Sequence, residues 1–228
     1  MVKYASNAFL ATKISFINEL ANLCEKIGVN IQDISIGMGL DQRIGDRFLR
    51  AGPAYGGSCF PKDTRALIDV ANKYKIDLSI VKNVVKSNNQ RKIILTKRID
   101  KILKNRLKNK NITFLGVTFK PNTDDMREAS SIPMINYLNK KGSKIRYYDP
   151  SGRKKEFDKL KNVKFYSSIS SACIKSDLII IHTEWNAFKL LNFKKLVKKK
   201  NFKVFDMRNI YSQDKMRDLK IDYTSIGR

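Results

Sequence analysis

The chain has 228 residues, of which 42% are hydrophobic and 29% are charged. This length suits one large domain or two modest ones, and it excludes a small disulfide-stapled scaffold. No apolar run approaches the ~20 residues of a membrane helix, and the first residues do not form a basic-then-apolar leader with a cleavage site. We therefore expect a cytoplasmic protein with no membrane partner.

The net charge of +25, from 46 basic and 21 acidic residues, raises the question of a nucleic-acid partner. Residues 1–110 carry 21 basic and 9 acidic residues, a net of +12, and residues 111–228 carry 25 and 12, a net of +13. The excess is therefore spread evenly. Its densest run, at 198–200, is typical of a solvated helix end, so nucleic-acid binding is the less favoured interpretation.

Residues 1–107 have the pattern of helices. Apolar positions recur at three- and four-residue steps from Phe9 to Ile27, which predicts a helix ended by Gly28 with Cys24 on its core stripe. A second helix is predicted from an Asn30 cap to the glycines at 37 and 39. Further helices follow Pro61 and a Ser79 cap. Between them, residues 40–61 are rich in Gly and Pro without any period, and a loop of this length is usually functional.

The pattern changes after a Lys- and Asn-rich link at 104–111. Short β-type runs occur at 112–117, 144–148, 163–166, 178–182 and 202–205. Helix-length segments such as 129–138 separate them, which predicts a parallel sheet covered on both faces. The predicted fold is α/β, with an all-helical domain at 1–107 followed by a Rossmann-like parallel domain at 108–228. Neither the G-x-G-x-x-G turn nor the G-x-x-x-x-G-K-[ST] loop is present.

The strongest chemical signal is the stretch GGSCFPKD at 56–63. Pro61 is typical of the first residue of a helix, which would put Cys59 just before a helix N-terminus, where a thiolate is favoured. Lys62 and Asp63 follow on the first turn. The only histidine, His182, is expected at a strand end in the other domain, which disfavours a Cys–His hydrolase pair. A cysteine without a histidine base suits attack on an aldehyde, by way of a thiohemiacetal and a thioester.

Several other polar residues are candidates only in combination. Lys3 and Asn7 are four residues apart and so share one helix face. Arg43 and Arg127 lie in glycine- or proline-broken loops, where arginines often bind phosphates, although each alone is better explained as surface charge. The three cysteines are odd in number and widely spaced, which favours reduced thiols and no metal site.

Taken together, ordered stretches along essentially the whole chain resemble the nucleotide-sugar dehydrogenases. They are KYASNAFLA at 3–11, NEL at 18–20, DQRIG at 41–45, FLRAGPAYGGSCFPKD at 48–63, GVTFKPNTDDMREAS at 116–130, YDP at 148–150, TEW at 183–185 and FDMRN at 205–209. The resemblance implies an NAD-dependent, two-step oxidation of the C6 hydroxyl of UDP-glucose, or of a related nucleotide sugar, to a carboxylate.

The resemblance also implies roles for individual residues. Cys59 would be the nucleophile, Asp63 would help activate water, and Lys3 and Asn7 would stabilise charge on the C6 oxygen. The implied substrate-binding residues are Lys3, Asn7, Arg43, Arg50, Ala51, Gly52, Pro53, Ala54, Tyr55, Gly56, Phe119, Lys120 and Arg208. Those implied to contact NAD are Cys59, Lys62 and Arg127. Arg43 would act across a dimer interface, and the helix after Ser79 resembles the dimer-forming helix of the family, so a homodimer is expected.

The sequence departs from the family pattern because it begins at the helical middle domain and contains no dinucleotide fingerprint. We therefore expect the isolated chain to be inactive, with the NAD-binding domain either supplied by a separate chain or lost in a truncated remnant. Three interpretations stay open: the substrate half of a dehydrogenase, a non-catalytic UDP-sugar-binding or dimerising protein, and a basic nucleic-acid binder. The cluster of Cys59, Lys62 and Asp63 favours the first.

Overall fold

The computed structural model describes residues 1–228, which fold into two compact units. The first unit comprises Met1–Ile93 together with Ile226–Arg228, and the second comprises Ile94–Ser225. This division lies before the predicted boundary at residue 107. It also places the last three residues with the helical unit, whereas the sequence analysis assigned them to the second domain. No helix combines the length and the apolar character that crossing a membrane requires.

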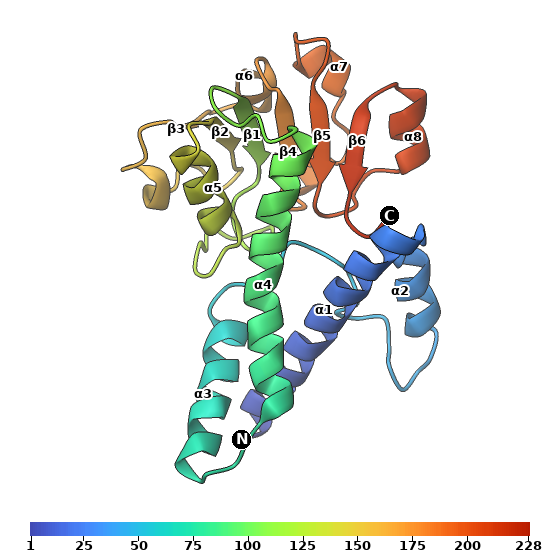
Figure 1. Ribbon diagram of the computed structural model, residues 1–228, viewed down its shortest axis with the longest axis vertical. Coiled ribbons are helices and arrows are strands. Elements are labelled where there is room, and N and C mark those ends of the chain that lie inside the picture. The colour runs from blue at the N-terminus through green and yellow to red at the C-terminus, as the bar shows by residue number, and fades with distance from the viewer. The chain divides into compact units, whose positions relative to one another are not determined.

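The first unit is helical, as predicted (Figure 1). Its helices are α1 (Val2–Ile27), α2 (Ile31–Gly39), α3 (Cys59–Lys73) and the first part of α4 (Ser79–Ile102), which continues into the second unit. Gly28 ends α1 because it adopts a left-handed conformation, φ 74°, and its N–H bonds the carbonyl of Cys24. Asn30 caps α2 by accepting the N–H of Gln32.

Two details of the helical prediction were wrong. Helix α3 begins at Cys59 itself, not at Pro61. Phe9 and Ile27, at the two ends of the predicted stripe, are 67% and 60% exposed. The buried face of α1 consists largely of small and polar residues: Ala8, Ala11, Ser15, Ile17, Asn18, Ala21 and Cys24. Small side chains allow α1 to approach α3 closely, so hydrophobic periodicity alone misplaces the edges of this face.

The second unit contains a sheet of six parallel strands. They are β1 (Asn111–Leu115), β2 (Lys144–Tyr148), β3 (Val163–Phe165), β4 (Leu178–Ile181), β5 (Lys203–Asp206) and β6 (Asp222–Ser225). The predicted parallel α/β class is confirmed. β6 was not predicted, because it is a strand of only four residues, DYTS, that lies at the sheet edge and has no run of apolar residues.

Helices and short turns cover this sheet. They are α5 (Ser131–Lys140), η1 (Lys155–Phe157), α6 (Ile169–Cys173), η2 (Asn186–Phe188), α7 (Phe193–Leu196) and α8 (Gln213–Asp218). Because both faces are covered, β4 is apolar at every position and entirely buried.

The strand order β3-β2-β1-β4-β5-β6 reverses direction between β1 and β4 (Figure 1). The chain therefore leaves the neighbouring carboxyl ends of these strands toward opposite sides. In open parallel sheets, ligands bind in the crevice at such a switch point. The segments that follow β1, β4 and β5 are thus where this fold presents a ligand site.

Candidate functional site

Cys59 is the only exposed cysteine of the chain, and it is the first residue of α3. The hydroxyl of the preceding Ser58 lies 3.8 Å from its sulfur. Cys24 and Cys173 are buried, and burial raises the pKa of the Cys173 thiol to about 12. The three thiols are free, as predicted, and Cys59 is the one that a reagent can reach.

Asp63 lies one turn further along α3, with its side chain fully buried. The amide Nδ2 of Asn7 donates to Asp63 Oδ2 at 2.6 Å, and Lys62 forms an ion pair with the other carboxylate oxygen. These two bonds, that of Lys62 first, hold the pKa of the Asp63 carboxyl below its ordinary value, and the positive charge of Lys3 adds to the effect. The predicted residues of α1 and α3 are therefore brought together around one ionised carboxylate.

Residues 51–57 form a loop that is buried throughout, and we call it the glycine loop. The partners of its backbone are side chains of the helices. The N–H of Gly52 donates to Asn18 Oδ1 at 2.8 Å, and the carbonyl of Gly52 accepts Arg91 Nε at 3.1 Å. These bonds satisfy buried polar groups that would otherwise be costly.

Tyr55 is held in the same manner by Asn88. Its N–H donates to Asn88 Oδ1 at 2.9 Å, and its carbonyl accepts Asn88 Nδ2 at 3.1 Å. Ala54 lies between the two held positions at φ 150°, a conformation that residues with a side chain rarely adopt. The ring of Tyr55 packs edge-on against Phe60, with centroids 6.0 Å apart, directly beside Cys59.

Sequence reasoning missed Asn88 and Arg91, and it gave Asn18 no role. All three are at most 5% exposed. The sequence did contain a signal for them, because each is a polar residue at a position of an amphipathic helix that faces the core. A buried polar side chain needs a hydrogen-bond partner, and so predicts one.

The predicted arginines of the first unit lie on the surface. Arg43 is 89% exposed and forms a bidentate pair with Asp41, with Nη2–Oδ2 at 2.6 Å and Nε–Oδ1 at 3.0 Å. Arg50 is exposed at the start of the glycine loop. Neither has a bond to the Asp63 cluster, so their predicted contacts with substrate stay predictions.

In the second unit, Arg208 connects the segments that follow β1, β4 and β5. Its Nε donates to the carbonyl of His182 at 2.8 Å and lies 2.9 Å from a carboxylate oxygen of Glu184, and its Nη2 donates to the carbonyl of Phe119 at 3.0 Å. The predicted residues Arg208 and Phe119 therefore meet at the switch point of the sheet. Lys120 is exposed, with its ammonium 5.4 Å from the centroid of the Phe119 ring.

Asp206, at the end of β5, holds the segment that carries Arg208, and the sequence analysis did not identify it. Its carboxylate accepts the N–H of Arg208 at 2.9 Å and the hydroxyl of Tyr223 at 2.9 Å. Tyr223 belongs to β6, the strand that was not predicted. Arg127 is mostly exposed and forms a bidentate pair with Asp125, with Nη2–Oδ2 at 2.8 Å.

Two domains of one enzyme family match successive parts of this chain. Residues 1–90 match the central domain of the UDP-glucose/GDP-mannose dehydrogenase family, and residues 113–213 match its UDP binding domain. The chain belongs to this family. The family assignment agrees with the resemblance found in the sequence.

Relatives of the chain in this family include two bacterial enzymes. The chain is 46% identical over its full length to the UDP-glucose 6-dehydrogenase of Rickettsia typhi and covers 53% of it. It is 45% identical over its full length to the UDP-glucose 6-dehydrogenase YwqF of Bacillus subtilis and covers 52% of that protein. The structure of a UDP-glucose dehydrogenase from Pyrobaculum islandicum superimposes with a TM-score of 0.84 at 32% identity, over 98% of this chain and 49% of that one. The chain thus spans about half the length of these family members.

NAD is the cofactor that this family implies, and the turn after β1 does not have the glycine pattern that binds a dinucleotide. The segment after β1 reads GVTFK and has one glycine where a dinucleotide turn needs three. That glycine, Gly116, faces Thr183, because a Cβ at Gly116 would lie 2.5 Å from Thr183 Cβ. The space at this turn is therefore taken by protein. The chain also contains no group of three or more side chains that could hold a metal ion.

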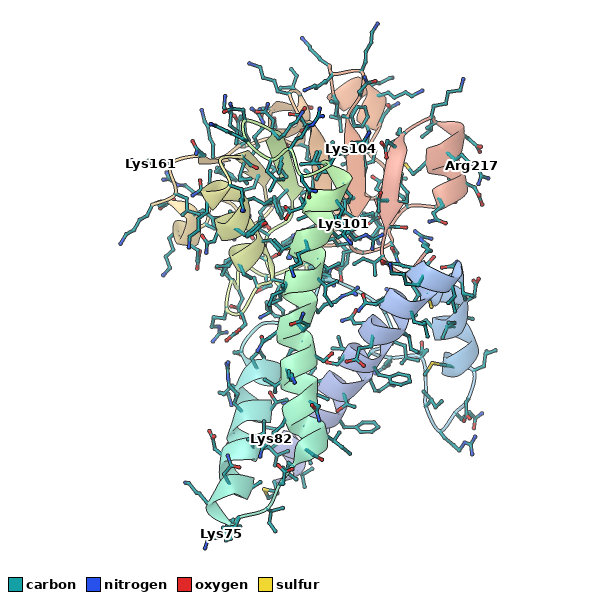
Figure 2. The ribbon with its side chains drawn as sticks, in the orientation of Figure 1. Lys75, Lys82, Lys101, Lys104, Lys161 and Arg217 are labelled. Atoms are coloured by element: carbon teal, nitrogen blue, oxygen red, sulfur yellow. The ribbon has the colours of Figure 1, made fainter.

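The basic residues of this family member are distributed over many elements. Figure 2 labels exposed cations in the turn after α3 (Lys75), at both ends of α4 (Lys82, Lys101) and beyond it (Lys104), before β3 (Lys161) and on α8 (Arg217). Charge that is scattered in this way does not mark out any one of these elements as a binding surface.

Proposed function

We propose that this chain is the substrate-binding and nucleophile-bearing part of an NAD-dependent UDP-glucose 6-dehydrogenase, which oxidises UDP-glucose to UDP-glucuronate in two steps. The observation that carries the proposal is the exposed Cys59 thiol on the first residue of α3, one turn from the buried Asp63–Asn7–Lys62 cluster. The match of residues 1–90 to the central domain of the family supports it.

Cys59 acts once C6 has reached the aldehyde level. Its thiolate adds to the carbonyl carbon, so that a sulfur–carbon bond forms and the carbonyl π electrons move to oxygen. The Lys3 ammonium and Asn7 stabilise this oxyanion. Asn7 uses one amide hydrogen on Asp63 and keeps its second for this oxygen. Asp63 therefore orients Asn7 as well as carrying charge.

Oxidation of the thiohemiacetal to the thioester removes a hydride from C6, and NAD supplies the acceptor when its own domain is present. Water then adds to the thioester carbonyl, and the Cys59 thiolate leaves. Asp63, which the Lys62 and Asn7 hydrogen bonds keep ionised, accepts a proton from that water. The carboxylic acid that forms loses its remaining proton to solvent, which leaves a carboxylate at C6, the free thiolate and a protonated Asp63.

The second unit contributes the nucleotide contacts. Lys120 and Arg208 supply positive charge for the diphosphate, and Phe119 supplies an apolar ring beside them. The glycine loop and Arg50 serve the sugar nucleotide. Lys62 and Arg127 approach NAD, and in a homodimer Arg43 serves the substrate of the other copy. The 228 residues alone do not turn over substrate, because they lack the main NAD site.

The test is a calorimetric titration of the chain with UDP-glucose at moderate salt, with GDP-mannose and a short RNA as controls. We expect saturable binding of UDP-glucose only, with equal affinity in the variant Cys59→Ser. When the NAD-binding domain of a relative is added, the native chain should form UDP-glucuronate and Cys59→Ser should not. A folded chain that binds the RNA but not UDP-glucose would overturn the proposal. Sugar-nucleotide binding without turnover in the complemented chain would instead support a non-catalytic binding protein.

A further inference from the structure

His182 is a buried group that the proposed chemistry does not use. It follows the last residue of β4, its exposed fraction is 0%, and it is the only histidine of the chain. Both ring nitrogens have partners: Nε2 lies 2.8 Å from the hydroxyl of Ser130, and Nδ1 lies 3.1 Å from the hydroxyl of Thr183. Ser130 directly precedes α5, so the ring joins two segments that are distant in sequence.

The network determines which nitrogen carries the proton. The Thr183 hydroxyl donates its only hydrogen to the carbonyl of Thr118, at 2.7 Å, so toward the ring it can only accept. Nδ1 is therefore the protonated nitrogen. Burial keeps the ring neutral, because it lowers the pKa of His182 to about 3. Nε2 is then unprotonated and accepts the hydroxyl hydrogen of Ser130.

The hydrogen bonds from His182 to Thr183 and from Thr183 to Thr118, which we call the relay, end at the backbone of the segment after β1. This segment contains the predicted nucleotide-binding residues Phe119 and Lys120. Thr118, whose carbonyl the relay holds, directly precedes Phe119 and Lys120. The carbonyl of Phe119 accepts Arg208 Nη2 at 3.0 Å, while Arg208 Nε donates to the carbonyl of His182 itself at 2.8 Å. The His182 ring is therefore connected to Thr118 through Thr183, and the His182 carbonyl is connected to Phe119 through Arg208.

We propose that His182, as its neutral Nδ1–H tautomer, is a positioning residue for nucleotide binding. Its ring directs the Thr183 hydroxyl to the carbonyl of Thr118, and it thereby holds Phe119 and Lys120 in place for the ligand. This role rests on the proposed function, because it requires that the chain bind a nucleoside diphosphate at the switch point.

The variants His182→Asn and His182→Leu separate this role from simple packing. Asn can place an N–H donor where Nδ1 lies, whereas Leu has no donor and fills more of the volume. If the His182 ring only fills space, Leu should preserve UDP affinity better than Asn. If the ring positions Thr183, Asn should preserve UDP affinity better than Leu. We expect the Kd for UDP, measured by calorimetry, to rise at least tenfold in His182→Leu and to stay within threefold of the native value in His182→Asn.

A second pair covers the case in which His182→Leu does not fold. Thr183→Val removes the relaying hydroxyl at nearly equal volume, and Thr183→Ser keeps it. We expect the tenfold loss of UDP affinity in Thr183→Val and near-native affinity in Thr183→Ser. Equal affinities within either pair, or tighter binding by the apolar variant, would overturn the assignment.

Because the chain has a single histidine, nitrogen NMR reports the tautomer without interference. We expect the His182 spectrum to show a protonated Nδ1 and an unprotonated Nε2, whether or not UDP is bound. A dominant Nε2–H form would overturn the relay even if UDP binds. A native chain with the expected tautomer and no affinity for UDP would contradict the proposed function, and the positioning role with it.

Discussion

Asn88 forms two hydrogen bonds with the backbone of Tyr55, accepting its N–H at 2.9 Å and donating to its carbonyl at 3.1 Å. One side chain of α4 thus bonds both polar groups of the Tyr55 backbone, as a neighbouring strand would in a sheet. The two residues are 33 positions apart in the sequence. This pair connects the fold of the helical unit to the segment that leads into Cys59.

Replacement of Asn88 by Ala should remove both of these buried hydrogen bonds. Each lost bond to a buried backbone group costs about 1–3 kcal/mol, so we expect the free energy of unfolding to fall by about 2–6 kcal/mol. Denaturant titration measures this change, and amide hydrogen exchange should show faster exchange at Tyr55.

The matched control for this substitution is Asn89→Ala, because Asn89 is the next residue on α4 and is exposed. We expect a change within about 0.5 kcal/mol for it. If the two variants unfold at the same denaturant concentration, the Asn88–Tyr55 pair contributes nothing to stability.

Thiol labelling should distinguish Cys59 from the other two cysteines. In the folded chain, iodoacetamide should modify one thiol, since Cys24 and Cys173 are buried and burial raises the pKa of the Cys173 thiol to about 12. Mass spectrometry after labelling should show one adduct in the folded chain and three in denaturant. The folded variant Cys59→Ser should show none. Labelling at Cys24 or Cys173 in the folded chain would contradict the buried positions of these residues.

Acid should weaken the fold through His182. Burial lowers the pKa of its ring to about 3 from an ordinary 6.5. As the pH falls below 6.5, the unfolded chain takes up a proton that the folded chain refuses until about pH 3, so the free energy of unfolding falls with pH over this range. The loss due to His182 between pH 7 and pH 5 amounts to about 2 kcal/mol.

Other groups also titrate in this range, so the measurement is a comparison with His182→Asn, which has no titrating ring. Denaturant titrations at pH 7 and pH 5 should show a larger loss in the native chain than in the variant, by that same amount. An equal loss in both proteins would mean that His182 titrates alike in the folded and unfolded states.

Gly116→Ala should destabilise the sheet unit. Gly116 has φ 75°, and an added Cβ would lie 2.5 Å from the Cβ of Thr183. Left-handed backbone costs about 1–2 kcal/mol for a residue with a Cβ, and the overlap adds about 1–3 kcal/mol. Gly152 also has positive φ, at 91°, but its Cβ would meet nothing within 4 Å.

We therefore expect Gly152→Ala to lower the free energy of unfolding by the backbone cost alone and Gly116→Ala to lower it by about 2–5 kcal/mol. Gly116→Ala should also weaken UDP binding, because it displaces Thr183. Equal stability of the two variants would show that the Thr183 side chain moves aside without lowering the free energy of unfolding.

Local pattern in the sequence determined the element types, because hydrophobic period, caps and glycines act within a few residues. It predicted the helices of the first unit, five of the six parallel strands and the place of Cys59 near a helix start. It missed β6, whose four polar residues become a strand only by pairing with β5. The family match was also visible in contiguous stretches such as those around Cys59 and Arg127.

Contacts between distant segments were decided only by the tertiary structure. Nothing near Asn88 in the sequence points to Tyr55, and nothing near His182 points to Ser130, which lies 52 residues away. The exposure of Phe9 and the burial of Asn18 likewise depend on how helices pack. A buried polar side chain is stable only with a partner, and that partner comes from whatever segment the fold brings alongside. The sequence therefore determined the element types and the family, and the tertiary structure decided which buried polar residues hold distant segments together.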